Sequence, residues 1–156
     1  MSIPNTFKGG YANILLGDGQ SSETFKLICG LNSQGLTHQV NATDQFVPDC
    51  TDPEAIAVRA RIQESEQWDI TGSGLATPEN IILMESLVKQ RLHLKFQLAI
   101  PPALTGYTAS SWLGYFYMGG FTTTGAKGQN SGLVTLTGLN FASDGVVTFT
   151  PGNVPT

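Results

Sequence analysis

The sequence is short of charged residues and of the side chains that build reactive sites. Only 13% of its 156 residues are charged, and it has two histidines and two cysteines. These four residues, Cys29, His38, Cys50 and His93, lie much further apart in sequence than the ligands of a zinc finger. There is also no Gly-x-Ser-x-Gly motif to present a nucleophilic serine. We therefore expect no metal site, no catalytic centre and no enzymatic activity.

The sequence also lacks a basic excess and long apolar runs. Its net charge of -4 disfavours non-specific attraction to phosphate backbones or to anionic membranes. The first residues show no basic segment followed by an apolar stretch, and Ile81 to Met84 is typical of the longest apolar runs. We expect neither an export signal nor a membrane anchor.

The two cysteines can pair only in an oxidising compartment. Cys29 alternates with Phe25, Leu27 and Leu31, which favours a small buried side chain on the apolar face of a strand. We expect both thiols to be free, although the sequence leaves open whether they ever pair.

The sequence is rich in residues that make turns and short strands. It has eighteen glycines and eight prolines, and 40% of its residues are hydrophobic, enough for one core. We expect a single mainly β domain over residues 1–156, with an N-terminal arm at 1–10, a core at 11–150 and a C-terminal arm at 151–156.

One helix is clearly marked, over Pro78 to Gln90. Thr77 can cap its first turn and Pro78 lies where a missing N–H costs nothing. At 100° per residue, one face collects the apolar residues Ile81, Leu83, Met84, Leu87 and Val88. Ile82 falls on the opposite, polar side, so it is either a single exposed apolar residue or a contact with another chain.

Alternating polar and apolar residues predict most of the strands. The clearest example, Arg91 to Ile100, follows the helix. The other predicted strands are Tyr11 to Leu16, Glu23 to Leu31, Ala55 to Ile62, Trp68 to Leu75, Ser111 to Phe121, Gly132 to Leu139 and Val146 to Thr150, the last two forming a closing hairpin.

The segment from Asn32 to Pro53 shows no period and predicts a long loop. It is acidic, because no Lys or Arg occurs between Lys26 and Arg59, and it carries Asp44, Asp49, Asp52 and, just beyond it, Glu54. Two interpretations stay open: a solvated acidic loop, or a functional segment that becomes ordered when it meets a partner.

A dinucleotide site must be considered, because Trp68 to Leu98 reads strand, Gly-x-Gly, helix, strand. The third glycine position is Thr77, and no carboxylate follows the second strand to hold a ribose. That strand also alternates, whereas strands of a doubly wound sheet are apolar on both faces. We expect no cofactor.

The same stretch carries a family resemblance. The resemblance lies in the strand WDITGSGLATPE, the helix ILMESLVKQ and the strand RLHLKFQL, together with the closing segment SGLVTLTGLNFASDGVVTFT. These segments resemble the major tail tube proteins of long-tailed (siphovirus-like) bacteriophages and gene transfer agents. The resemblance covers most of the chain from about Tyr11.

The resemblance implies a β-sandwich flanked by one helix, with a long inter-strand loop and extended terminal arms. Hexameric rings of the protein would stack into a tube in a virion tail, assembled in the host cytoplasm, and double-stranded DNA would pass through without specific binding. Tape measure and tail terminator or tip proteins would be partners. The long loop and the terminal arms would become ordered only where rings meet.

Charge suggests how subunits would meet. We hypothesise that Asp44, Asp49, Asp52 and Glu54 of one subunit face basic residues of a neighbour, such as Arg59, Arg61, Arg91 and Lys95. Ile82 is a further interface candidate. An acidic lumen would repel phosphates, although mild acidity is also ordinary in soluble domains.

A second function fits the same composition. An immunoglobulin-like binding or decoration module on a virion or cell surface would also be a sandwich, but it would present its loops to a ligand and stay monomeric.

Overall fold

A computed structural model describes residues 12–20, 22–102, 104–125 and 134–155. The predicted N-terminal arm, residues 1–10, lies outside the described residues. Within the described ranges, no helix is long and apolar enough to cross a membrane. The elements are β1 (Ala12–Gly17), β2 (Phe25–Leu27), β3 (Leu31–Val47), β4 (Val58–Leu75), α1 (Pro78–Leu87), β5 (Arg91–Leu98), β6 (Ser110–Thr124), β7 (Thr135–Ser143) and β8 (Thr148–Thr150).

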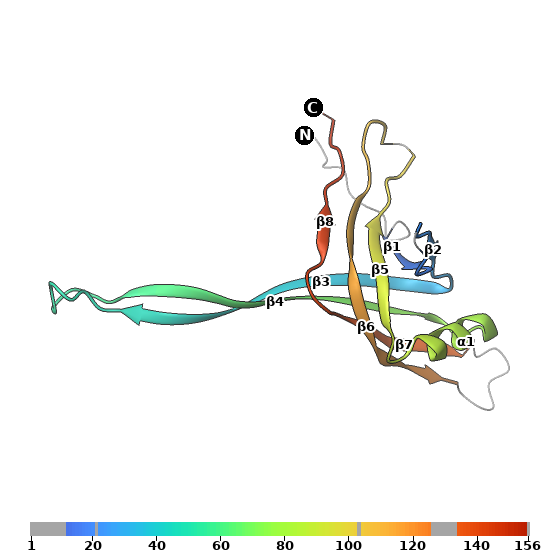
Figure 1. Ribbon diagram of the computed structural model, residues 1–156, viewed down its shortest axis with the longest axis horizontal. Coiled ribbons are helices and arrows are strands. Elements are labelled where there is room, and N and C mark those ends of the chain that lie inside the picture. Colours follow the sequence, from blue (N-terminus) through green and yellow to red (C-terminus); the bar gives the residue numbers. More distant parts are fainter. Residues whose placement is uncertain (1–11, 21, 103, 126–133, 156) are drawn as a thin grey trace.

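All strands join one antiparallel sheet in the order β2-β1-β5-β6-β7-β4-β3, with β8 also paired to β6. The sheet bends at β6, which pairs with β5 as far as Tyr117 and then continues beside β7 through register shifts around Gly120. Gly120 has φ +144°, which favours glycine. In Figure 1, β5, β6 and β8 run across the direction of β3 and β4. The predicted mainly β fold is confirmed, and its two layers belong to one folded sheet.

The core lies between these layers. One cluster of fully buried side chains joins five strands. It contains Ile14 of β1, Leu94 of β5, Phe116 of β6, Ile70 of β4 and Phe141 of β7. Because alternate residues of a strand point to opposite faces, each of these five strands gives one face to this cluster and the other to solvent. Tyr115 and Tyr117 of β6 are exposed, so the outer face of β6 is not covered at these positions within the subunit.

The predicted helix is confirmed as α1. The Thr77 hydroxyl accepts a hydrogen bond from the backbone N–H of Asn80 at 3.2 Å, which satisfies one of the free donors of the first turn. Met84 and Leu87 are buried against the core, whereas Ile82 is 73% exposed, as the helical periodicity predicted. The helix ends at Leu87, before the predicted Gln90, because Val88 is extended and Lys89 adopts φ +69°.

The predicted loop over Asn32 to Pro53 is wrong, because most of it is β3. β3 pairs with β4 along its whole length, from Leu31 opposite Gly74 to Val47 opposite Val58. Only the part of β4 from Asp69 onward also pairs with β7. Residues 38–68 therefore leave the body as a two-stranded arm, which Figure 1 shows projecting far from the other strands. Period-2 patterning comes from burial of one face, and β3 beyond Leu36 has no face buried in the subunit core to produce it.

The predicted closing hairpin is also wrong. β7 and β8 do not pair with each other: β7 lies along the second half of β6 and β8 along its first half, both antiparallel to it. The interruption at Asp144 is held to β6 by a hydrogen bond from its backbone N–H to the Tyr115 carbonyl at 2.8 Å. Ser143 to Gly145 thus form a break between two strands that run in the same direction, not a reversal.

Two smaller expectations change as well. Cys29 is exposed and free, and Ile28 is the buried residue, because β2 ends at Leu27 and the alternation stops there. The C-terminal residues 151–155 are not a loose arm: the Asn153 carbonyl accepts from the Thr108 N–H at 3.1 Å, and the Gly152 N–H donates to the Ser110 hydroxyl at 2.9 Å. Gly152 is required there, since a Cβ atom would lie 2.0 Å from the Thr108 carbonyl oxygen.

The burial pattern of β6 predicts the effect of two neighbouring truncations. Phe116→Ala should lower the free energy of unfolding by about 3–5 kcal/mol, because the ring is fully buried where both layers meet. Tyr117→Ala, at an exposed position next to it, should cost no more than about 1 kcal/mol. Urea denaturation followed by tryptophan fluorescence measures both, and equal losses would contradict this core.

Candidate subunit interface on the arm

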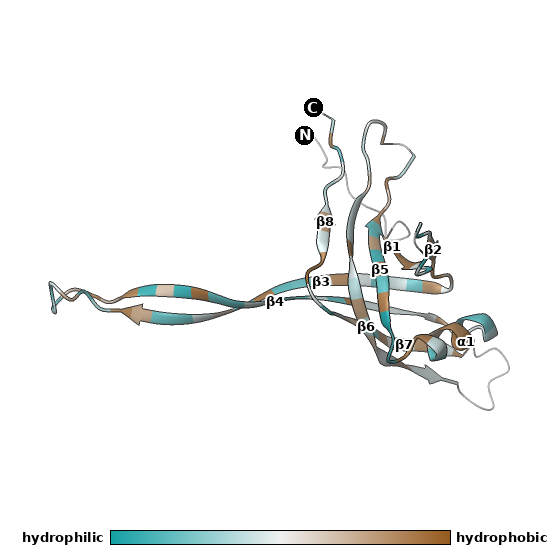
Figure 2. Ribbon diagram, in the orientation of Figure 1, coloured by the Kyte–Doolittle hydropathy of each residue, from teal (hydrophilic) through white to brown (hydrophobic). Residues whose placement is uncertain are grey.

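One face of the arm carries apolar side chains that nothing in the subunit covers. The register places Val47 opposite Val58 and Thr43 opposite Ile62, so these side chains lie on one face. We call Val47, Val58, Ala60 and Ile62, with Ile56 at the tip, the apolar strip. Val58 is 71% exposed and Ile56 91% exposed. Figure 2 shows hydrophobic residues among hydrophilic ones along the arm. A lone two-stranded hairpin is marginally stable in water, so this surface is suited to a partner.

The opposite face of the arm carries ion pairs beside Phe46, which lies opposite Arg59 and is 70% exposed. Asp44 lies 3.3 Å from the Nε atom of Arg61 and 3.9 Å from Nη1 of Arg59, on the neighbouring strand. All three side chains are more than a third exposed, and exposed ion pairs stabilise by no more than about 1 kcal/mol. Three residues predicted to act between subunits are thus brought together within one chain.

At the tip of the arm, carboxylates hold the turn. The Asp49 carboxylate accepts from the backbone N–H of Thr51 at 2.9 Å and from its hydroxyl at 2.7 Å. The Asp52 carboxylate accepts from the N–H of Glu54 at 3.2 Å. The hydrogen bonds from Thr51, its hydroxyl first, lower the pKa of Asp49 below its ordinary value. The tip therefore projects acidic groups away from the body.

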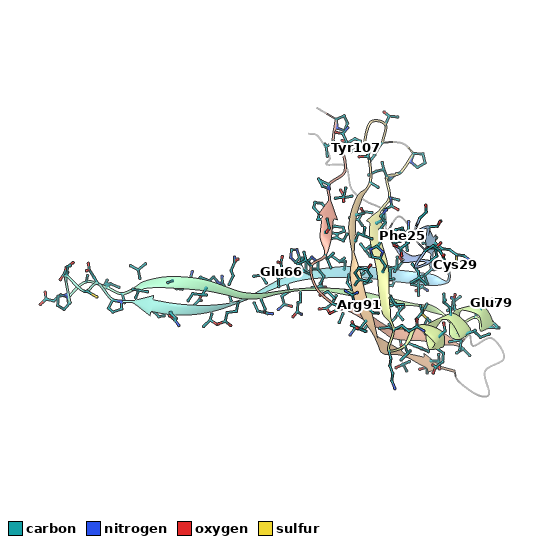
Figure 3. The ribbon with its side chains drawn as sticks, in the orientation of Figure 1. Phe25, Cys29, Glu66, Glu79, Arg91 and Tyr107 are labelled. Atoms are coloured by element: carbon teal, nitrogen blue, oxygen red, sulfur yellow. The ribbon has the colours of Figure 1, made fainter. Side chains whose placement is uncertain are left out.

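The root of the arm is fixed by His38 and Trp68, which face each other across β3 and β4. The two rings stack with centroids 4.7 Å apart and planes 14° apart, and His38 Nε2 lies 2.5 Å from the Glu66 carboxylate. The backbone N–H of Trp68 donates to the Ser143 hydroxyl at 3.1 Å, which ties the arm to the end of β7. Figure 3 labels Glu66 at this root. Stacking and pairing here set the direction in which the arm leaves the body.

The remaining candidates lie on the body, far from the arm tip. Arg91 Nε pairs with Asp144 at 2.6 Å, and its guanidinium lies 4.0 Å from the centroid of the Tyr115 ring. The Lys95 ammonium lies 5.2 Å from the centroid of the Phe25 ring. Figure 3 labels Phe25 and Arg91 on this part of the body. The structure does not bring Ile82, Arg91 or Lys95 to the acidic tip within one chain.

Sequence reasoning missed the apolar strip as an interface. The alternation of Ile56, Val58, Ala60 and Ile62 predicted a strand, but alternation alone does not tell whether the subunit's own core or another chain covers the apolar face. The neighbouring polar run from Glu64 to Gln67 was the available signal, because it separates this alternation from the buried Trp68 and Ile70.

The hydrogen bonds at the tip predict an acid response. Thr51→Val removes the hydroxyl donor, so the pKa of Asp49 should rise toward its ordinary value. Because the folded turn lowers the pKa of Asp49, the ionised carboxylate stabilises the turn fully at pH values above the ordinary pKa. This stabilisation is lost as the pH falls through the lowered pKa. The variant's turn should therefore open at a higher pH than that of the wild type. NMR titration of the Asp49 carboxyl carbon measures this, and an unchanged midpoint would contradict it.

No protein-family model matches the chain, and no curated protein matches its sequence. Solved structures do share its fold. A chain in the virion of a native gene transfer agent particle is similar with a TM-score of 0.65 and 17% identity, covering 94% of this chain and all of that chain. A chain in the C6-symmetric tail of an empty gene transfer agent particle is similar with a TM-score of 0.64 and 18% identity, covering 94% of this chain and all of that chain. A chain in the six-fold symmetrised baseplate of the anti-feeding prophage is similar with a TM-score of 0.54 and 10% identity, covering 98% of this chain and 96% of that chain. The fold inferred from the resemblance is confirmed.

Proposed function

We propose that this protein is a structural component of a virion tail, whose copies form hexameric rings that stack into a tube conducting double-stranded DNA. The observation that carries the proposal is the apolar strip, which is exposed in the subunit at the end of a long, unsupported arm. The shared fold with chains of a virion and of a C6-symmetric tail supports it. The proposal places the protein in the tail after assembly in the host cytoplasm, beside tape measure and terminator or tip proteins.

The arm has the length to reach another copy. Its strand from His38 to Val47 adds roughly 30 Å beyond the body at about 3.3 Å per residue. Covering a Val or Ile side chain that is otherwise exposed stabilises an interface by about 1.5–3 kcal/mol. The strip therefore favours association at the far end of the arm, and the body stays free to pack with other copies.

Removing the apolar strip should prevent assembly. In Val58→Ser with Ile62→Ser, two of the side chains that a second copy would cover are lost, and the dissociation constant of that contact should rise about a hundredfold or more. Negative-stain microscopy and sedimentation of the concentrated protein measure assembly: the wild type should form rings or tubes and the variant should not.

The matched control lies on the opposite face of the same arm. Ala42 and Gln63 face each other there, so Ala42→Ser with Gln63→Ser alters the arm without touching the strip. This control should assemble like the wild type. A wild-type protein that stays monomeric at high concentration would overturn the tube and favour the binding module, and equal assembly of all three proteins would remove the strip from the interface.

We also propose that the tip carboxylates Asp49, Asp52 and Glu54 steer assembly toward Arg91 and Lys95 of a neighbouring copy. Asp44 is excluded from this role, because it already pairs with Arg59 and Arg61 of its own chain. The tip carboxylates project with no basic residue between Asp44 and Arg59, so they complement a basic surface elsewhere.

Neutralising the charges at the tip should weaken assembly, and reversing them should weaken it more. Asp49→Asn with Asp52→Asn keeps oxygen acceptors for the turn and should slow tube growth, most strongly at low salt. Asp49→Lys with Asp52→Lys should abolish tubes while circular dichroism shows a folded subunit. Light scattering follows growth, and normal tube yield from the Lys variant would refute steering by the tip.

A further inference from the structure

One exposed face of the sheet is built of amide and hydroxyl side chains that bond to each other. On the root half of the arm, the Gln39 amide donates to Asn41 at 3.3 Å, and Asn41 donates to the Ser65 hydroxyl at 2.9 Å and to Gln67 at 3.4 Å. The Gln67 amide then donates to the Asp69 carboxylate at 3.1 Å. The register places these residues on one face of β3 and β4, and we call them the amide ladder.

On the three strands β3, β4 and β7, the face that carries the ladder has no Lys or Arg. β3 and β7 contain neither Lys nor Arg, and the two arginines of β4, Arg59 and Arg61, lie on the opposite face beside Asp44. The face continues onto the body through Thr71 and Asn140, which are opposite each other on β4 and β7. Beyond β7, the same surface of the folded sheet reaches Arg91 of β5, because Asp69 lies opposite Ala142, Ala142 opposite Tyr117 and Tyr117 opposite Arg91.

We propose that the amide ladder and its continuation on β7 are the surface that faces the passing DNA duplex; this inference rests on the proposed tube. Affinity for a nucleic acid backbone comes mainly from cations that release its counterions, and β3, β4 and β7 offer none on this face. The single carboxylate, Asp69, adds repulsion. The ladder's amides also satisfy one another, which leaves fewer donors directed at a phosphate. Such a wall lets a duplex slide without holding it.

The position of the ladder along the arm agrees with this assignment. Further toward the tip, the same face becomes the apolar strip, at Ile62, Ala60 and Val58. Where a second copy covers the face it is apolar, and where the ladder lies it is polar and hydrated. One face of one strand pair thus changes character between a part that contacts protein and a part that contacts solvent and DNA.

Two lysine variants test which face meets DNA. Gln39→Lys places a cation on the ladder and can still donate to Asn41, whereas Gln63→Lys places a cation on the opposite face of the same arm. Tubes of each variant are incubated with a short DNA duplex and sedimented over a range of salt. The ladder variant should retain at least about tenfold more duplex at low salt than the wild type, with the excess lost as salt rises, and the control should resemble the wild type.

Thiol labelling gives an independent readout that does not depend on DNA. In a background where the exposed Cys29 and Cys50 are replaced by serine, Ser65→Cys on the ladder should react in assembled tubes with N-ethylmaleimide but not with a bulky polymer maleimide. In the same background, the monomer should react with both reagents.

The outcomes separate the two proposals. Tubes whose Ser65→Cys reacts with the bulky reagent, or with neither reagent, would overturn the DNA-facing assignment alone, and so would equal DNA retention by both lysine variants. A wild-type protein that never assembles would overturn the proposed tube, and this inference with it.

Discussion

The pairing of β3 with β4 is the constraint on which the rest of the structure depends. Its first part, up to Trp68, is supported by β7 on one edge and by the core beneath Ile70. Among the described residues, its second part is supported by its own backbone hydrogen bonds, the cross-strand hydrogen bonds of Asn41 and the ion pairs of Asp44. A hairpin of this kind gains little stability from itself, because both of its faces remain in water. The subunit therefore carries a long segment whose packing is incomplete until another surface covers it.

This incompleteness explains why the sequence predicted the body better than the arm. Helix α1 and strand β5 have one face in the core, so burial selected Met84, Leu94 and Phe96 at the spacing that each element requires, and both elements were predicted correctly. β3 has no such selection beyond Leu36. Its alternation disappears and a loop was predicted, although the backbone is extended and paired.

Other failures have the same local cause. The run Ser143, Asp144 and Gly145 has the residue types of a tight turn, which predicts a reversal of the chain between two strands. β6 is long enough to hold two strands end to end on one edge, and that tertiary pairing overrode the local signal. The interface candidates were chosen by charge, and charge correctly grouped Asp44 with Arg59 and Arg61, but as partners within one chain. Charge could not identify the apolar strip, because exposure at Val58 is a property of the fold and not of composition.

The apolar strip and the amide ladder impose different requirements on the same two strands. A strip exposed in the free subunit is an aggregation hazard, since a flat two-stranded ribbon with unpaired edges invites further strands to pair with it. On the opposite face, Asp44, Arg59 and Arg61 limit this hazard by keeping the surroundings of the exposed Phe46 charged. Fixing the root through the His38 and Trp68 stack limits the directions in which the strip can be presented. A fixed root and a row of apolar side chains along one face favour a single mode of association, which an ordered tube needs in place of an amorphous aggregate.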